Sequence, residues 1–585
     1  MAILGPASRA GLAVVVLAVA ASAAGILPLG DIKPGLRGTG RTIFSGGSIE
    51  TFDVEILGVL ENIGPKQSLI LARLSGGPLE RTGVMQGMSG SPVYIDGKLI
   101  GAVAMAFPNA KEPIAGIRPI EEMLATPTAE PPQRAALSAE NLLAGLPGRG
   151  EVIAGPSRMT DIATPLSLGG FTRAAVEHFA PQLRALGLEP VQGTASGGRA
   201  GLPMGDPKKL EPGSMISVQL ITGDFVAGAD GTVTHLDGDR IYAFGHRFLS
   251  VGPAELPFAR AEVIALLPST VSSFKISNAL EPMGVITQDR NAAIAGTLGR
   301  RARMVPVSID VQGAGRSASY RMEMVEDRYL SPFLLQMMMY SAIDATERTA
   351  GASSFRVRGE VEFDGVESPL RLDNAIASDS GAAAMASLYT ALPYAYVLQT
   401  GFDRLRAKRV QLSIESRDEK DALQIDDAYA DHVKVRPGQT VTVHVVLAGR
   451  NGAETIKSVS YPTPIGLSSG PLYFTVSDGM TANLAEIKQL LGATPRSPAQ
   501  AVATVNRLRE NDRVYVRVWR PEVAFQTEAS DFPAPPPSLA MLFSRSQGRQ
   551  GGLTQGYSSR IAEMSFDGTG AAISGARTFQ VEVTE

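Results

Sequence analysis

Cysteine is absent from this sequence of 585 residues. The absence excludes disulfide bonds, thiolate metal sites, a cysteine nucleophile and a lipid anchor attached to cysteine. Histidine is scarce: there are 5, scattered and without an HExxH pattern. No phosphate-binding loop of the GxxxxGK[ST] type occurs either. The sequence therefore predicts no metal and no cofactor.

Charge of one sign and long hydrophobic runs are also lacking. The formal net charge is −4 and the basic residues do not form long runs, so nucleic acid is not an expected partner. After the N-terminus, no stretch reaches the about 20 apolar residues that a membrane-spanning helix needs. The apolar segment 331–342 is shorter than that, and we expect it to form a buried helix.

The N-terminus carries the features of an export signal. Arg9 supplies a positive charge, residues 11–20 (GLAVVVLAVA) form a short apolar run, and Ala21-Ser22-Ala23 fits the small-residue cleavage pattern. We predict a signal peptide over 1–23 that is only transiently associated with the membrane, and an exported protein, periplasmic or extracellular. The alternative is an uncleaved anchor.

The remaining chain has a globular composition, with 44% hydrophobic and 19% charged residues. Its length predicts roughly three or four domains. Thr51–Leu60 alternates apolar and polar residues, as a half-buried strand does. Val93–Ala106 reads as two apolar strands around Asp96-Gly97, which is a strong hairpin signal.

A serine stands in a glycine-rich turn just before this hairpin, in Gly87-Met88-Ser89-Gly90-Ser91-Pro92. Acyl transfer needs an exposed hydroxyl on a tight turn, with backbone N–H groups that converge on the developing oxyanion. Glycines on both sides of Ser89 permit that turn, and the N–H groups of Gly87 and Ser89 are candidates for the oxyanion hole. Ser91 is a second candidate nucleophile, and an ordinary surface turn is the alternative.

The segment from Val84 to Ile117 resembles the SpoIVB peptidase family of bacterial serine peptidases. The shared features are GMSGSP, a following hairpin of the form GKLIGAV, and the upstream stretch FDVEILGVLEN. The resemblance covers roughly residues 26 to 125. It implies a chymotrypsin-like fold, with Ser89 as nucleophile, and regulatory cleavage of a few protein substrates.

A general base for Ser89 should be one of the histidines. His246 ends the segment GTVTHLDGDRIYAFGH, which is similar in order and spacing to the family's segment around its base. The resemblance therefore implies His246 as the base. The alternative is a hydrogen-bonded structural histidine at a strand end. His178, His235, His432 and His444 lack the glycine-flanked context.

Two features depart from the family pattern. The serine segment precedes the histidine segment here, whereas the family has the reverse order; a triad is defined by geometry, so a rearranged domain can still assemble one. The family's upstream acidic segment corresponds to 73–79 (RLSGGPL), which has no carboxylate. Asp289, in a loop after a strand, is our replacement candidate for the acid. The alternative is a solvated loop aspartate.

The fold class that we predict is mainly β. It comprises a chymotrypsin-like double β-barrel peptidase domain in rearranged segment order, a C-terminal immunoglobulin-like β-sandwich and some helices. Helices are expected near 173–188, 330–350, 383–398 and 483–508. The predicted regions are a signal peptide (1–23), a serine-bearing half of the peptidase domain (24–125), a linker with helices (126–212), a histidine-bearing half (213–329), a connecting region (330–407), the sandwich (408–480) and a tail of helix, strand and proline-rich segment (481–585).

The sequence thus predicts a secreted or periplasmic serine endopeptidase that acts on protein or peptide substrates through an acyl-enzyme. The predicted catalytic residues are Ser89, His246 and Asp289, with Gly87 and Ser89 as the oxyanion hole. The alternative is a catalytically weak or inactive peptidase-fold envelope protein that serves as a scaffold or binding module. In either case the C-terminal sandwich is expected to bind an envelope protein partner.

Overall fold

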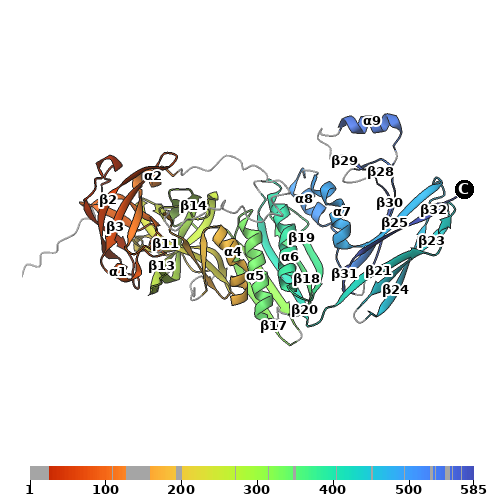
Figure 1. The fold of residues 1–585 in the computed structure, drawn as a ribbon, viewed down its shortest axis with the longest axis horizontal. Coiled ribbons are helices and arrows are strands. Elements are labelled where there is room, and N and C mark those ends of the chain that lie inside the picture. The colour runs from red at the N-terminus through yellow and green to blue at the C-terminus, as the bar shows by residue number, and fades with distance from the viewer. Residues whose placement is uncertain are drawn as a thin grey trace, which may run out of the picture.

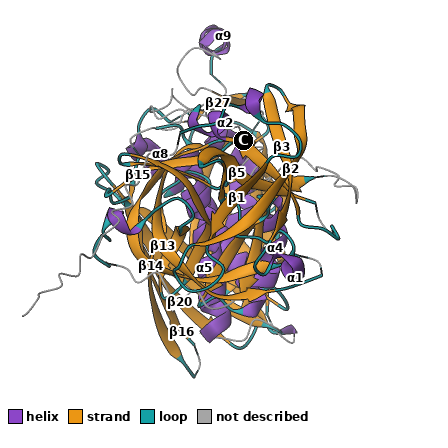
Figure 2. Cartoon of the chain, turned by 90° about the vertical axis from the view of Figure 1, so that its left-hand side faces the viewer, coloured by secondary structure: helices purple, strands orange, loops and turns teal. Residues whose placement is uncertain are grey.

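The computed structural model is an elongated molecule that begins with a β-barrel and ends with a β-sandwich (Figure 1). Figure 2, which views the molecule from the barrel end, shows strands making up most of the fold, so the expected mainly β class is confirmed. The structure describes residues 25–107, 110–126, 159–192, 201–270, 272–313, 315–346, 351–402, 405–449, 452–492, 495–526, 531–533, 535–546, 554–556, 558–567 and 570–585. The predicted signal peptide lies outside these residues.

The first unit is a closed barrel of six strands, which we call the serine barrel. Its strands follow the order β4-β1-β2-β3-β6-β5, and a β4–β5 pairing closes the ring. The Asp96-Gly97 hairpin is confirmed: both residues have positive φ, which a two-residue hairpin turn of type I′ requires. The elements are η1 (Leu29–Asp31), β1 (Arg37–Thr42), β2 (Glu50–Gly64), β3 (Gln67–Ser75), α1 (Leu79–Thr82), β4 (Pro92–Ile95), β5 (Lys98–Ala106), β6 (Ile114–Pro119) and α2 (Ile120–Leu124).

A second ring of six strands, the histidine barrel, lies against the first. Its order is β10-β13-β14-β15-β12-β11, closed by a β10–β11 pairing. Apolar side chains of both barrels meet at the junction, where Ile43 packs with Met215 and Val263. The elements are η2 (Pro207–Lys209), β10 (Met215–Gly223), β11 (Val226–Asp237), β12 (Arg240–Ala243), β13 (Gly252–Leu267), β14 (Phe274–Asp289) and β15 (Ile294–Leu298).

The sheet of the histidine barrel continues on both sides into the middle of the molecule, for thirteen strands in all. Helices α4, α5 and α6 cover this extension (Figure 1). The helices expected near 173–188, 330–350 and 383–398 are confirmed, the last two as apolar, largely buried segments. The elements of the extension are β8 (Thr164–Gly169), α4 (Arg173–Ala185), β9 (Leu188–Gln192), β16 (Met304–Gln312), β17 (Ser317–Val325), α5 (Leu330–Thr346), β18 (Ser353–Phe363), β19 (Leu370–Ser378), α6 (Ala382–Gln399) and β20 (Ala407–Arg417). Strand β7 (Thr160–Asp161) pairs instead with β5, in the sheet of the serine barrel.

The C-terminal unit is a sandwich of a four-stranded and a five-stranded sheet around one apolar core. Its extent differs from the predicted 408–480. Strand β20 pairs with β16 and β18 in the central sheet, whereas the tail contributes β26, β30, β31 and β32 to the sandwich. These pairings join strands far apart in the sequence, so local patterns did not reveal them. The immunoglobulin-like strand order stays a prediction.

The sandwich strands are β21 (Ala422–Ala430), β22 (Lys434–Val435), β23 (Thr440–Ala448), β24 (Glu454–Pro462), β25 (Gly470–Asp478), β26 (Arg513–Arg520), β30 (Ser559–Asp567), β31 (Ala572–Ser574) and β32 (Ala576–Val583). Helices α7 (Gly479–Gly492) and α8 (Pro498–Val505) confirm the helical segment expected near 483–508. A small outlying sheet carries α9 and comprises β27 (Ala524–Gln526), β28 (Asp531–Pro533), α9 (Pro537–Ser546) and β29 (Thr554–Gly556). No helix within the described part of the chain is long and apolar enough to cross a membrane.

Candidate active site

The serine turn, residues 86–92, connects helix α1 to strand β4 and lies at the junction of the two barrels. Gly87 and Gly90 have φ of +87° and +92°, which glycine adopts without strain. The side chain of Met88 packs in the core of the serine barrel and fixes the middle of the turn there. A Cβ built on Gly90 would lie 2.0 Å from the carbonyl oxygen of Thr232, so this position admits only glycine.

Strand β11 of the histidine barrel binds the serine turn along its backbone. The N–H of Thr232 donates to the Ser89 carbonyl at 2.9 Å, and its hydroxyl donates to the Gly87 carbonyl at 3.0 Å. The Thr234 hydroxyl donates to the Gly90 carbonyl at 2.7 Å. Three consecutive contacts therefore fix a turn of one barrel on a strand of the other.

His246 follows strand β12 and reaches the same junction. Gly245, with φ of +68°, makes the chain turn there. A Cβ on Gly245 would lie 3.3 Å from the Val103 carbonyl, the group that accepts the N–H of Gly90 at 2.7 Å. Gly90 thus binds the Val103 carbonyl and Gly245 lies close to it, so the structure brings the two predicted segments together.

The ring of His246 is oriented by the backbone. Its Nδ1 lies 2.7 Å from the carbonyl oxygen of Arg247. A carbonyl can only accept, so Nδ1 must carry a proton, and in the neutral ring the lone pair is then on Nε2. This is the tautomer that a general base acting through Nε2 requires.

The Ser89 hydroxyl is enclosed. Ser89 is 0% exposed and His246 is 1% exposed. Within the described part of the chain, Ser89 Oγ forms no hydrogen bond, so the serine–histidine hydrogen bond is not made in this arrangement. Catalytic hydrogen bonds are often incomplete before substrate binds.

Asp289, the predicted acid, lies at the end of β14 and is buried. Its carboxylate accepts the backbone N–H groups of Phe248, Leu249 and Val251 at 2.8, 2.7 and 3.2 Å. Burial raises the pKa of this carboxyl, and the backbone hydrogen bonds lower it in part. The Asp289 carboxylate therefore binds the loop that follows His246. The hydrogen-bond partner of His246 Nδ1 is the Arg247 carbonyl and not this carboxylate.

The other predicted groups fall at distinct places in the turn. Among the described residues, no acceptor binds the backbone N–H of Gly87 or of Ser89, the predicted oxyanion-hole donors. Ser91, the second candidate nucleophile, donates its hydroxyl to Thr42 Oγ1 at 3.1 Å on strand β1. Ser91 is thus bound into the barrel junction, which favours Ser89 as the nucleophile of the two.

The remaining histidines contact other groups. His178 stacks on Tyr340 between α4 and α5, and His432 and His444 lie in the sandwich. His235 is on β11 near Tyr242, and burial lowers its pKa. Over the described ranges, no group of three or more His, Asp or Glu side chains is arranged to hold a metal ion.

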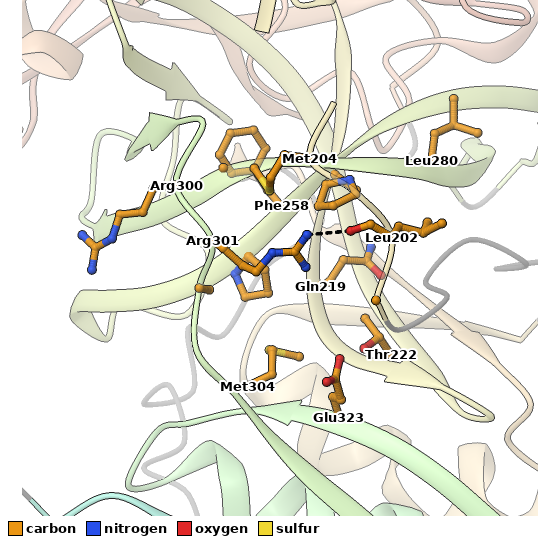
Figure 3. Close-up of a pocket in the computed structure, with 16 residues that line it drawn as sticks. Leu202, Met204, Gln219, Thr222, Phe258, Leu280, Arg300, Arg301, Met304 and Glu323 are labelled. Carbon is orange, nitrogen blue, oxygen red and sulfur yellow. Dashed lines mark hydrogen bonds between the residues drawn. The ribbon is translucent and has the colours of Figure 1, made fainter. Parts of the chain in front are cut away.

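A cleft elsewhere in the histidine barrel is lined by none of the predicted site residues (Figure 3). Leu202, Met204 and Phe258 form part of its apolar wall. Arg301 crosses it and donates to the Leu202 carbonyl at 2.6 Å. The cleft and the serine turn lie at different positions along the paired strands β10 and β11. Gln219 of β10, which lines the cleft, pairs with Gly228, whereas the serine turn binds residues 232–234 of β11.

Sequence reasoning missed several residues that shape the site. Thr232 and Thr234 have the i, i+2 spacing that puts two side chains on one face of a strand, and this signal was available in GTVTH. Lys275, fully buried beside Gly87, gave no such signal, because a lysine in a strand is usually solvent-exposed.

Comparison with known proteins supports the resemblance. Residues 29–124 match the family model described as SpoIVB peptidase S55. The matched segment contains the serine barrel and the serine turn, and the histidine barrel lies outside it. No curated protein and no solved structure matches the chain. Over residues 29–124, the chain is therefore similar to the SpoIVB peptidase S55 family.

Proposed function

We propose that the protein is an exported serine endopeptidase that cleaves protein substrates through an acyl-enzyme. The observation that carries the proposal is the junction itself: β11 hydrogen-bonds the backbone on both sides of Ser89, and the Val103 carbonyl accepts from Gly90 and lies close to Gly245. The family match of the serine barrel gives the reaction class. The export signal remains a prediction from residues 1–23.

The proposed reaction assigns one role to each group. Ser89 Oγ attacks the scissile carbonyl as Nε2 of His246 takes its proton, and the N–H groups of Gly87 and Ser89 bind the oxyanion. The imidazolium then gives the proton to the leaving amine, and the C–N bond breaks. Water, deprotonated by His246, releases the acyl group and restores the serine hydroxyl.

The Arg247 carbonyl supplies part of what an acid supplies in a triad. It holds the Nδ1–H tautomer and faces the positive charge that develops on the ring during proton transfer. Asp289 acts in this proposal by ordering the loop at 248–251, which carries the ring's orientation. Its role as the triad acid stays a prediction.

We further propose a chymotrypsin-like arrangement in rearranged segment order. Two six-stranded closed rings with a serine turn from one and a histidine from the other, meeting at their junction, support it. In this proposal the C-terminal sandwich is immunoglobulin-like and docks an envelope protein, while the barrels act on the substrate.

A second candidate function is a non-catalytic scaffold that retains the peptidase fold. The complete burial of Ser89 and His246 favours it, because a peptide cannot reach a hydroxyl that is 0% exposed. The peptidase proposal therefore requires that the barrel junction opens when substrate binds.

The test is covalent labelling of the full chain by a fluorophosphonate probe. We expect labelling of the wild type and none of Ser89→Ala or His246→Ala. Matched controls are Ser48→Ala, which removes an exposed serine of the same barrel, and His432→Ala in the sandwich. Labelling that persists in Ser89→Ala would contradict the assignment. No labelling of the wild type, at any probe concentration up to millimolar, would favour the scaffold.

A further inference from the structure

Lys275 is a buried cation next to the serine turn. It lies at the start of β14 in the histidine barrel and is 1% exposed. Lysine is almost never fully buried unless its amine is bound by other groups. The neighbours of this side chain therefore indicate what it does.

The amine of Lys275 reaches the C-terminal end of the serine turn through one threonine. Nζ donates to Oγ1 of Thr42 at 2.7 Å, and Oγ of Ser91 donates to the same oxygen at 3.1 Å. Thr42 ends strand β1 and is 0% exposed. Lys275, Thr42 and Ser91 thus form a buried chain of hydrogen bonds across the barrel junction.

The backbone and alkyl chain of Lys275 hold the N-terminal end of the same turn. Its N–H donates to the Gln86 carbonyl at 3.2 Å, and the N–H of Gln86 donates to the Ser273 carbonyl at 2.9 Å. A Cβ built on Gly87 would lie 3.2 Å from Cδ of Lys275. The side chain therefore packs directly under the residue that carries a predicted oxyanion-hole N–H.

We propose that Lys275 is a positioning residue for the nucleophile: bound to Thr42 at its amine and packed under Gly87 along its chain, it holds the serine turn in the conformation that catalysis needs. The inference rests on the proposed function. It adds to Ser89 and His246 a residue that touches neither substrate nor reacting atoms.

The electrostatic surroundings make this support sensitive to pH. Burial lowers the pKa of Lys275 to about 7, and Glu50, at the start of β2, raises it in part. The neighbouring cation is Arg41, which precedes Thr42 on β1. Its guanidinium lies over the ring of Tyr94, 5.3 Å from the ring centroid. Within the described chain, no carboxylate lies within 4.0 Å of the amine. The neutral amine donates to Thr42 without the cost of a buried charge, so the turn is held best above pH 7.

The experiment compares the rate constant of fluorophosphonate labelling in the full-length wild type and Lys275→Met between pH 5.5 and 9. We expect the rate constant of Lys275→Met to be about tenfold lower at pH 8. We also expect the wild type to lose reactivity on acidification more steeply than the variant, because protonation of Lys275 loosens the turn only in the wild type. Equal rate constants with the same pH dependence in both proteins would overturn the proposal.

A matched pair at Thr42 separates positioning from general stability. Thr42→Val keeps the shape but removes the shared oxygen and should lower the rate constant, while Thr42→Ser keeps the oxygen and should restore it. Lys98→Met, at an exposed lysine of the serine barrel, is the control. An equal loss of labelling rate in Thr42→Val and Thr42→Ser would contradict the hydrogen-bond chain. This pair of variants therefore tests the proposal even if Lys275→Met does not fold.

A second readout keeps this proposal distinct from the proposed function. Backbone amide exchange in residues 85–91, followed by mass spectrometry, needs no activity. We expect about tenfold faster exchange there in Lys275→Met than in Lys98→Met. If the wild type does not label, the peptidase proposal fails while faster exchange still supports positioning by Lys275; unchanged exchange in this segment overturns it.

Discussion

Removal of the buried amine at Lys275 should make the protein more stable against global unfolding at neutral pH, even though it loosens the serine turn locally. Burial holds the pKa of Lys275 at about 7, against an ordinary value of 10.5. The folded state therefore binds fewer protons than the unfolded state between these values, and the free energy of unfolding rises with pH across this range. Below about pH 7 the fold bears the whole cost of the buried charge.

The magnitude follows from the difference between the two pKa values. At about 1.4 kcal/mol per pKa unit, the interval from about 7 to 10.5 corresponds to about 5 kcal/mol. Lys275→Met removes this cost but also the hydrogen bond to Thr42, which is worth about 1 kcal/mol. We therefore expect Lys275→Met to be about 4 kcal/mol more stable than the wild type at pH 6.5. Apolar replacement of a buried charge often has this sign.

The assay is pulse proteolysis in urea, which reports the unfolded fraction of the barrels directly. Cleavage products from the barrels are followed at pH 6.5 and pH 9, with Lys98→Met as the control. The difference between Lys275→Met and the wild type should shrink by more than half at pH 9, because the unfolded lysine approaches its own pKa. A difference that is equal at both pH values, or a variant less stable at pH 6.5, would refute the reasoning.

Two further predictions concern the junction. Gly90→Ala puts a methyl group 2.0 Å from the Thr232 carbonyl at a φ of +92°, so it should abolish labelling and destabilise the barrels by about 2 kcal/mol or more, as measured by pulse proteolysis; wild-type labelling would contradict the packing. Asp289→Asn places an amide NH2 against backbone N–H donors, so it should destabilise the loop at 248–251 by about 1–3 kcal/mol. We expect faster amide exchange in this loop and a lower labelling rate. Unchanged exchange would show that this carboxylate does not hold the loop.

Local structure was predictable wherever the deciding residues are neighbours in the sequence. Asp96-Gly97 predicted its hairpin because both residues tolerate positive φ, and the apolar segment at 331–342 predicted a buried helix because of its length and composition. Strand β20 could not be assigned in this way. Its partners β16 and β18 lie far away in the sequence, and its alternating pattern fits either sheet.

The candidate site was predictable in part for the same reason. The glycines around Ser89 and before His246 mark tight turns, and the family resemblance named both residues. No sequence pattern near Lys275 predicted its role. The residue is buried only because the two barrels pack against each other at this position of the strand. The backbone carbonyl of Arg247 as the partner of His246 was equally hidden, because any residue type could supply it.

The central claim is that Ser89 is a nucleophile that His246 activates at the barrel junction. The most direct measurement maps the fluorophosphonate adduct on the full-length protein by peptide mass spectrometry. The account predicts an adduct on Ser89 that disappears in His246→Ala and persists in His432→Ala. An adduct on another residue, or an adduct on Ser89 that forms as fast in His246→Ala as in the wild type, would contradict it.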